Sequence, residues 1–182
     1  MLMKRPDSLL LIIDVQERLA PAMDSPREVI TGCSKLIGAA AELGIPFIIA
    51  EQNPAKLGQT MVDLRVAAGE GAKFYPKMEF SCAANPEIMN AIKASGKKQI
   101  IIAGVEAHIC VLQTALELHA QGYEVFVVSD ASSSRRPLQT VISWQRLNRN
   151  GVDVVSSEMV LYEWLQTAAD PQYKAISKKY II

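Results

Sequence analysis

Three residues that can take part in acid–base or nucleophilic chemistry lie at or just past the ends of short apolar runs: Asp14, Lys77 and Cys110. A carboxylate can accept the proton of a thiol, a thiolate can attack a carbonyl carbon, and an ammonium group can stabilise the charge that develops. The three residue types together therefore indicate a nucleophilic site that needs neither a metal nor a cofactor. They can act together only if the fold brings them to one place.

Cys110 lies near the start of a predicted helix. The preceding run, residues 100–103, is short, apolar and closed by Gly104, which is typical of a strand buried on both faces of a parallel sheet. From Ala107 onward the apolar residues recur at helical spacing. Unpaired N–H groups and the helix dipole at this point favour negative charge, so we expect a lowered pKa for the thiol and donors for an oxyanion. A structural core cysteine is the simpler alternative, because cysteine is often buried.

Asp14 and Lys77 belong to two other predicted strands. Asp14 closes the apolar strand predicted over residues 8–15, where a carboxylate is costly unless it holds a neighbouring loop or faces a ligand crevice. Lys77 follows the weaker strand predicted over residues 71–75, whereas Lys73 lies inside it. Because the crevice of an open α/β sheet lies beyond the carboxyl ends of its strands, Lys77 is the lysine expected to reach it. A solvated surface position is the alternative for both lysines.

Strand and helix patterns alternate along the whole chain. Further strands are predicted over residues 45–50, 124–129 and 152–155. Helices are predicted from a capping box at 25–28 to Gly44, from the cap at 85–87, after the turn-rich segment 131–137, and over 158–168 and 171–179. Such βαβ units predict a single α/β domain over residues 1–182, with a parallel sheet covered by helices on both faces. The carboxyl ends of its strands share one edge, where the three chemically active residues converge.

Composition narrows the function classes. The 182 residues include 19 basic and 19 acidic side chains and no basic block, so neither a nucleic-acid nor a membrane partner is expected. No apolar stretch is long enough to span a bilayer and the first residues lack a signal-peptide core, which predicts a soluble cytoplasmic protein. Cys33, Cys82 and Cys110 have irregular spacing, which argues against a disulfide framework or a zinc site. Cys33 is expected in the core, and Cys82 is the second candidate for a reactive thiol.

Three segments resemble the isochorismatase-like cysteine hydrolases, a family that includes nicotinamidases and carbamoyl-amide hydrolases. They are LLIIDVQERL near the N-terminus, PKMEFS in the middle and IIAGVEAHICVLQTALELHAQGYEVFVVSDASSSR. The segment AEQNPAKLG, residues 50–58, is similar to the isochorismatase-domain-containing proteins within that family. The resemblance covers nearly the whole chain and implies a single doubly wound, mostly parallel six-stranded sheet in the order 3-2-1-4-5-6, with helices on both faces.

The resemblance also implies roles for individual residues. Asp14, Lys77 and Cys110 match the family's catalytic triad. A non-proline cis peptide bond is implied between Val105 and Glu106, and an oxyanion hole is implied at the backbone N–H groups of Glu106 and Cys110. The predicted pocket residues are Gln16, Leu19, Gln52 and Phe80, which lie just past strand ends, and Ser81, which matches the serine that follows the family's lysine.

The segment after the second predicted strand differs from that of the metal-dependent nicotinamidases in this family, which bind a metal there through one Asp and two His. Here it reads EQNPAKL and contains no histidine, so no metal or other cofactor is expected. Isochorismate cleavage does not need the cysteine, so the retained Cys110 favours acyl transfer. Glu106 stands where relatives commonly carry a small residue, and we expect it to narrow or charge the mouth of the pocket.

The sequence therefore predicts an enzyme that hydrolyses a small amide, carbamoyl compound or related carbonyl substrate through a thioester on Cys110. The alternative is a catalytically idle family member that acts as an oligomeric binding or scaffold protein. A redox role for Cys110, with Cys82 as resolving thiol, is a third possibility. The resemblance implies a homo-oligomer, a dimer or a tetramer. Arg135 and Arg136 are either solvated or part of an anion site or an interface.

Overall fold

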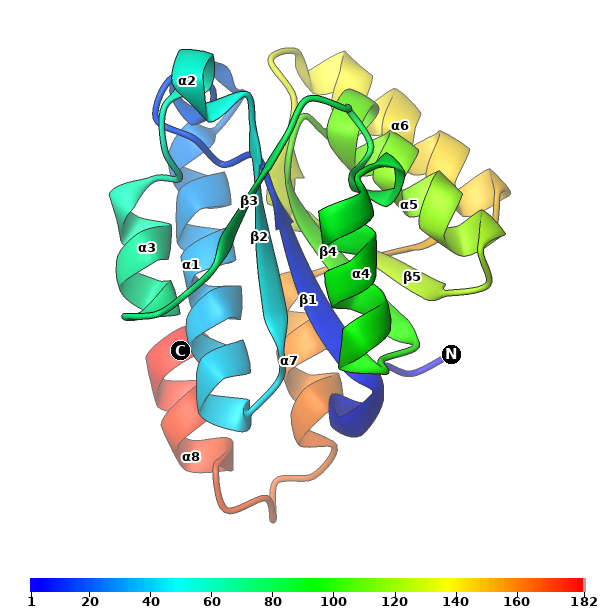
Figure 1. The fold of residues 1–182 in the computed structure, drawn as a ribbon. Helices are drawn as coiled ribbons and strands as arrows, with labels where there is room; N and C mark the ends of the chain where they lie inside the picture. Colours follow the sequence, from blue (N-terminus) through cyan, green and yellow to red (C-terminus); the bar gives the residue numbers. More distant parts are fainter. Residues whose placement is uncertain (182) are drawn as a thin grey trace.

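The computed structural model describes residues 1–181 and shows one sheet between two layers of helices (Figure 1). The six strands are all parallel and lie in the order β3-β2-β1-β4-β5-β6, which confirms the expected topology. They are β1 (Ser8–Ile13), β2 (Phe47–Gln52), β3 (Phe74–Lys77), β4 (Gln99–Val105), β5 (Glu124–Ser133) and β6 (Asp153–Val155). The order of connection reverses between β1 and β4, so the carboxyl ends of these two strands flank the topological switch point.

Helices cover both faces of the sheet, and each face has its own core. One core includes side chains of α1 (Pro26–Leu43), α3 (Val62–Ala68), α7 (Ser157–Leu165) and α8 (Tyr173–Ile176). The other includes side chains of α4 (Pro86–Ser95), α5 (Leu112–Ala120) and α6 (Pro137–Arg149). The short helix α2 (Pro54–Leu57) lies at the edge where the strands end, at the top of Figure 1.

Strand β1 shows why these residues form a central strand. All six of its residues are buried, and their side chains alternate between the two cores, with Leu10 and Ile12 on the α1 side and Leu9 and Leu11 on the α5 side. Complete burial of each such side chain contributes about 1.5–3 kcal/mol, so this strand anchors both layers. Its neighbour β4 approaches it so closely that a Cβ at Gly104 would lie 2.1 Å from the carbonyl oxygen of Ile13.

Several predicted boundaries were wrong. Strand β3 begins at Phe74 and ends on Lys77, so Lys77 is the last strand residue rather than a loop residue, and Lys73 precedes the strand. Pro76 lies inside the strand and made its end hard to predict from the sequence. A proline is tolerated there because β3 is an edge strand. Strand β5 continues to Ser133, through the first part of the segment predicted to be a turn.

The start of α1 also differs from the prediction. Pro26 is the first helical residue, but Ser25 has a left-handed backbone (φ 51°) and its side chain makes no capping hydrogen bond. The capping box is therefore absent. By contrast, Asn85 caps α4 through hydrogen bonds from the backbone N–H groups of Glu87 and Ile88, as predicted. Cys33 is fully buried in the α1-side core, also as predicted.

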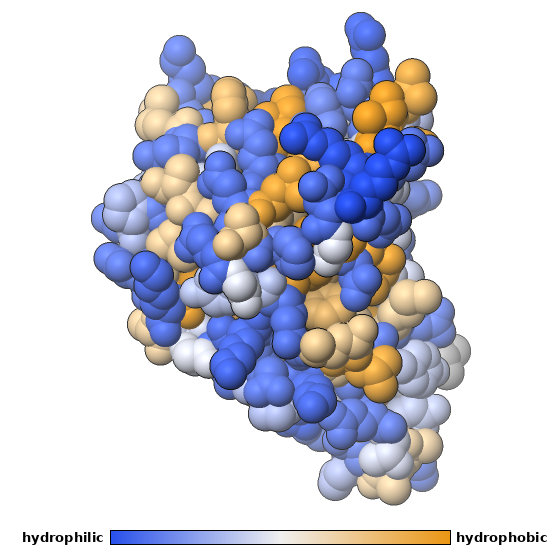
Figure 2. Space-filling view, turned by 90° about the vertical axis from the view of Figure 1, so that its right-hand side faces the viewer, coloured by the Kyte–Doolittle hydropathy of each residue, from blue (hydrophilic) through white to orange (hydrophobic). Residues whose placement is uncertain are grey.

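The surface mixes polar and apolar residues. The side of the molecule shown in Figure 2 has hydrophobic patches among the hydrophilic residues. The exposed apolar side chains of α6 are Leu138, Val141 and Ile142. Within residues 1–181, no helix has both the length and the apolar character needed to cross a membrane.

Candidate active site

Asp14 lies directly after β1 at the switch point. Its backbone is in the left-handed region (φ 57°), which aspartate tolerates better than most residues. The Asp14 N–H donates to the carbonyl of Ala50 on β2 at 3.0 Å, and its carbonyl accepts from the N–H of Gln16 at 2.9 Å. These contacts turn the chain sharply at the strand end. The carboxylate itself is fully buried, which is unusual for an aspartate outside a functional site.

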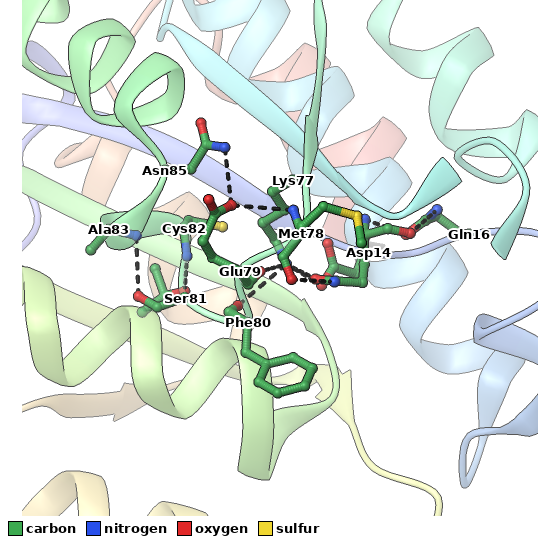
Figure 3. A network of polar contacts seen from close by, with 12 residues as sticks. Asp14, Gln16, Lys77, Met78, Glu79, Phe80, Ser81, Cys82, Ala83 and Asn85 are labelled. Atoms are coloured by element: carbon green, nitrogen blue, oxygen red, sulfur yellow. Dashed lines mark hydrogen bonds and ion pairs between the residues drawn. The ribbon is translucent and has the colours of Figure 1, made fainter. Parts of the chain in front are cut away.

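Lys77, at the end of β3, pairs with this carboxylate (Figure 3). Its Nζ lies 2.8 Å from Asp14 Oδ2, and both side chains are fully buried. The Nζ also donates to Gln52 Oε1 at 2.7 Å and lies 3.2 Å from the carbonyl oxygens of Glu79 and Phe80. An ammonium group has three protons, so four surrounding acceptors hold it in place and in its charged form. Lys77 therefore supplies a fixed positive charge.

Cys110 lies in the first turn of the helix that follows β4. This turn, Ala107–Val111, is π-helical and leads into α5. The thiol is 6% exposed and packs in the core on the α5 side of the sheet. Asp14 Oδ1 has no hydrogen-bond partner within the described residues, and Cys110 is near enough to act as a hydrogen-bonding neighbour of the carboxyl group. The structure thus brings Asp14, Lys77 and Cys110 together at the switch point.

The pKa values in this cluster follow from burial. Burial raises the pKa of Asp14 to about 6, against the opposing effects of Lys77 and Cys110. Burial also disfavours the charged form of Lys77, but the negative charge of Asp14 and its hydrogen bond to Lys77 outweigh this effect, so the pKa of Lys77 is raised. At neutral pH the resting cluster therefore contains an ionised Asp14 paired with a charged Lys77.

The expected lowering of the Cys110 pKa was wrong. Burial raises the pKa of the thiol, and the negative charge of Asp14 raises it further, while Lys77 only partly opposes them. The thiol sits deep in the core, where desolvation outweighs the favourable field of the helix N-terminus. Cys110 is thus a neutral thiol at rest. Burial also raises the pKa of the neighbouring Cys82 thiol, to about 12.

The backbone between β4 and Cys110 has the features of an anion site. The peptide bond between Val105 and Glu106 is cis, at the position where the resemblance implies one. Within the described part of the chain, the N–H groups of Glu106 and Cys110 donate to no backbone acceptor outside the Cys110 helical turn. Two such N–H groups beside a thiol are suited to hold the oxygen of a tetrahedral intermediate.

Two predicted pocket residues, Gln16 and Gln52, form the frame that holds Lys77. Gln16 is fully buried, and its amide group donates to the carbonyls of Gln52 and Gly58 and accepts from the N–H of Gln52. Gln52 in turn accepts from Lys77 and donates to the carbonyl of Met78 at 2.9 Å. The contact between Gln52 and Lys77 was missed by sequence reasoning, although both residues were expected just past the ends of predicted strands.

The side chains of the other three pocket candidates take no part in this frame, although the backbone carbonyl of Phe80 is one of the acceptors of Lys77. Leu19 packs against the core on the α1 side of the sheet. Phe80 is 57% exposed, and its ring extends away from the Lys77 ammonium group (Figure 3). Ser81 is buried, donates to Glu117 at 2.7 Å and accepts from the N–H of Ala83, so it caps the following turn.

A second polar cluster lies beside Glu106. A hollow of about 390 Å³ is lined by Glu106, His108, Arg135, Arg136 and Gln139. Arg135 Nε donates to both carboxylate oxygens of Glu106 at 3.0 Å, and the backbone N–H of Arg135 donates to one of them at 3.1 Å. The interaction between Glu106 and Arg135 was not foreseen, because the two residues are far apart in the sequence. No group of three or more His, Cys, Asp or Glu side chains suited to a metal ion occurs among residues 1–181.

The fold and the cluster at the switch point define a doubly wound α/β protein with a buried Asp–Lys pair next to a cysteine. Comparison with known families then identifies the family, because the model of the isochorismatase domain matches residues 8–159. The chain therefore belongs to the isochorismatase family.

Similar proteins come from animals and bacteria, among other organisms. Isochorismatase domain-containing protein 1 of Danio rerio is 36% identical over 171 residues, which are 93% of this chain but 59% of the relative. The chain thus spans about three fifths of that relative's length. The structure of the MAR1 ribonuclease of Caenorhabditis elegans superposes with a TM-score of 0.92 and 31% identity, covering 98% of this chain and 91% of the other. The YcaC protein of Escherichia coli, described as an octameric hydrolase of unknown specificity, has a TM-score of 0.93 at 24% identity, covering 100% and 91%.

Proposed function

We propose that the protein is a cofactor-independent hydrolase that cleaves a small amide, carbamoyl compound or related carbonyl substrate through a thioester on Cys110. The observation that carries the proposal is the fully buried ion pair between Asp14 and Lys77, in which Asp14 Oδ1 lies beside a thiol and has no hydrogen-bond partner among residues 1–181. A buried charge pair is costly and is weak evidence for stability. Its position at the switch point of the sheet favours a catalytic role.

In the first half of the proposed reaction, Asp14 accepts the proton of Cys110 as the sulfur attacks the carbonyl carbon. The new S–C bond converts the carbonyl oxygen to an oxyanion, which the N–H groups of Glu106 and Cys110 stabilise. The C–N bond then breaks, and the departing nitrogen takes the proton from Asp14. Ammonia or an amine leaves, and the acyl group remains on Cys110 as a thioester.

In the second half, Asp14 accepts a proton from water, whose oxygen attacks the thioester carbon. The S–C bond breaks, the acid product leaves, and the sulfur takes the proton back from Asp14. Lys77 keeps its protons throughout, because its four acceptors favour the charged form. Its charge holds Asp14 in place and keeps the pKa of Asp14 from rising beyond about 6, so that this base is ionised at neutral pH.

The test is acylation of the protein by p-nitrophenyl acetate, followed by a screen of small amides and carbamoyl compounds for ammonia release. We expect a burst of p-nitrophenol and an acetyl group on the peptide that contains Cys110. Cys110→Ala and Asp14→Asn should abolish the burst, whereas the matched control Cys33→Ala, at a buried cysteine remote from the pair, should retain it. Acetylation that ignores the Asp14 substitution would contradict the assignment of the base.

The alternative is a catalytically idle binding or scaffold protein. In that case iodoacetamide should modify Cys110 no faster than Cys33 or Cys82, and the modification rate should not respond to Asp14→Asn. Competition labelling with substoichiometric iodoacetamide, mapped by mass spectrometry, separates the two functions.

The exposed side chains of Leu138, Val141 and Ile142 on α6 support a homo-oligomer, to be measured by light scattering. We place the protein in the cytoplasm, consistent with its three free cysteines.

A further inference from the structure

Glu106 is a buried carboxylate whose hydrogen bonds come from a segment distant in the sequence. Its side chain is 7% exposed, and Arg135 provides every hydrogen bond that its carboxylate accepts within the described residues. Two of these bonds come from Nε and the third from the backbone N–H. His108 Nδ1 lies 4.0 Å from Glu106 Oε2. A buried carboxylate held by one arginine in this way has a single well-defined position.

Arg135 extends from a segment that is itself fixed. The three residues before it, Ser132, Ser133 and Ser134, are all buried. The N–H of Gly104 donates to Ser132 Oγ, Ser133 Oγ donates to the carbonyl of Asp24, and the N–H of Asp24 donates to the carbonyl of Ser134. The end of β5 therefore provides a rigid base from which Arg135 reaches Glu106.

Glu106 also carries one of the two N–H groups assigned above to the oxyanion hole. Its backbone follows β4 directly, and its side chain is drawn toward the hollow lined by His108, Arg136 and Gln139. The three hydrogen bonds from Arg135 hold the Glu106 side chain and, through it, the backbone that precedes the turn containing Cys110. A donor to an oxyanion is effective only if it is held in place before charge develops.

We propose that Arg135 is a positioning residue, which holds the Glu106 carboxylate and thereby keeps the Glu106 N–H in place for the oxyanion. This inference rests on the proposed function. Arg135 has no direct contact with the reacting atoms in this role. Its side chain is 59% exposed, so the simpler explanation is a solvated arginine whose contact with Glu106 has no effect on the reaction.

The experiment compares two reactions of the same thiol. Acylation by p-nitrophenyl acetate builds an oxyanion, whereas alkylation by iodoacetamide displaces iodide at a saturated carbon and builds none. Loss of the Arg135 contact should slow acylation of Cys110 by about tenfold to a hundredfold, less than the roughly hundredfold to thousandfold loss on removing an oxyanion donor outright, and leave alkylation unchanged. The variant is Arg135→Met. The matched control is Arg136→Met, which removes a second arginine from the same hollow but no contact with Glu106.

Glu106→Gln provides an independent variant, because it keeps the backbone and the side-chain volume while removing the charge that Arg135 binds. It should reproduce the selective loss of acylation, and the double variant should lose no more than either single one, since both break one interaction. Equal slowing of both reactions in Arg135→Met, or of neither, would overturn the inference. If the unsubstituted protein is alkylated but never acylated, the proposed function fails and this inference falls with it.

Discussion

Replacing Lys77 with methionine should destabilise the fold in a strongly pH-dependent way. The substitution keeps the length and apolar stem of the side chain but removes the ammonium group, which lies 2.8 Å from Asp14 Oδ2 with both side chains fully buried. Removing one partner of a buried ion pair leaves an uncompensated charge and costs about 3–5 kcal/mol. At pH 8 we therefore expect the free energy of unfolding of Lys77→Met to fall by about that amount.

The pH dependence follows from the direction of the Asp14 shift. The folded-state pKa of Asp14 is already raised from 3.8 to about 6, and the substitution removes the positive charge that opposes the rise. A raised carboxyl pKa gives stability that is fully present below the unfolded-state value and is lost as the pH rises through the folded-state value. At pH 5 the variant's Asp14 is protonated and needs no cation, so most of the destabilisation should disappear.

Urea denaturation at pH 5, 6.5 and 8 measures the effect, with Asp14→Asn/Lys77→Met as the variant that removes both charges. The double variant should show a smaller loss that does not change with pH. Lys73→Met is the matched control, because Lys73 is exposed and precedes the same strand. An equal destabilisation of Lys77→Met at pH 5 and pH 8 would refute the role assigned to the Asp14 charge.

Two further outcomes are expected. The rate of Cys110 acylation should rise with pH to a plateau, with a midpoint near the Asp14 pKa of about 6. At pH 5 the rate should be about a tenth of its plateau value. Burst rates between pH 4.5 and 7.5 measure this, and a rate that does not change with pH would argue against Asp14 as the base. Gly104→Ala should destabilise the fold by about 3 kcal/mol or more, because its Cβ would lie 2.1 Å from the Ile13 carbonyl oxygen. Gly44 also has a positive φ, 70° against 125° at Gly104, but no atom within 4 Å of its Cβ position among the described residues, so Gly44→Ala should cost only about 1–2 kcal/mol in thermal unfolding.

The architecture could be predicted because its signals are local and repeated. Apolar runs that end at Asp14 and Gly104 mark central parallel strands, and the family resemblance supplied the strand order. The edge strand was harder to place, because Pro76 interrupts its pattern and only pairing with β2 shows that Lys77 belongs to it. The position of Lys77 at the carboxyl edge could still be inferred, since an error of two residues does not move it to the other end of the strand.

The sequence predicted which residues make up the site better than it predicted their interactions and pKa values. Which acceptor holds Lys77 depends on the register between β2 and β3, which places Gln52 beside Lys77 and its side-chain oxygen at the ammonium group. The interaction of Arg135 with Glu106 likewise depends on how far β5 extends. The sign of the Cys110 pKa shift was wrong for a related reason: a sequence shows that a thiol starts a helix, but not how deeply the helix start is buried.

The raised pKa of Cys110 is consistent with nucleophilic catalysis when the whole cluster is considered. At neutral pH the thiol is protonated, while Asp14, with a pKa of about 6, is ionised. Transfer of the proton to Asp14 is therefore unfavourable at rest and becomes favourable only as the S–C bond forms and sulfur loses its negative charge to the oxyanion. A thiol activated in this way is protonated at rest, so its reactions with electrophiles depend on transfer of the proton to Asp14. Burial, which raises both pKa values, thus makes the reactivity of Cys110 depend on Asp14 as its base.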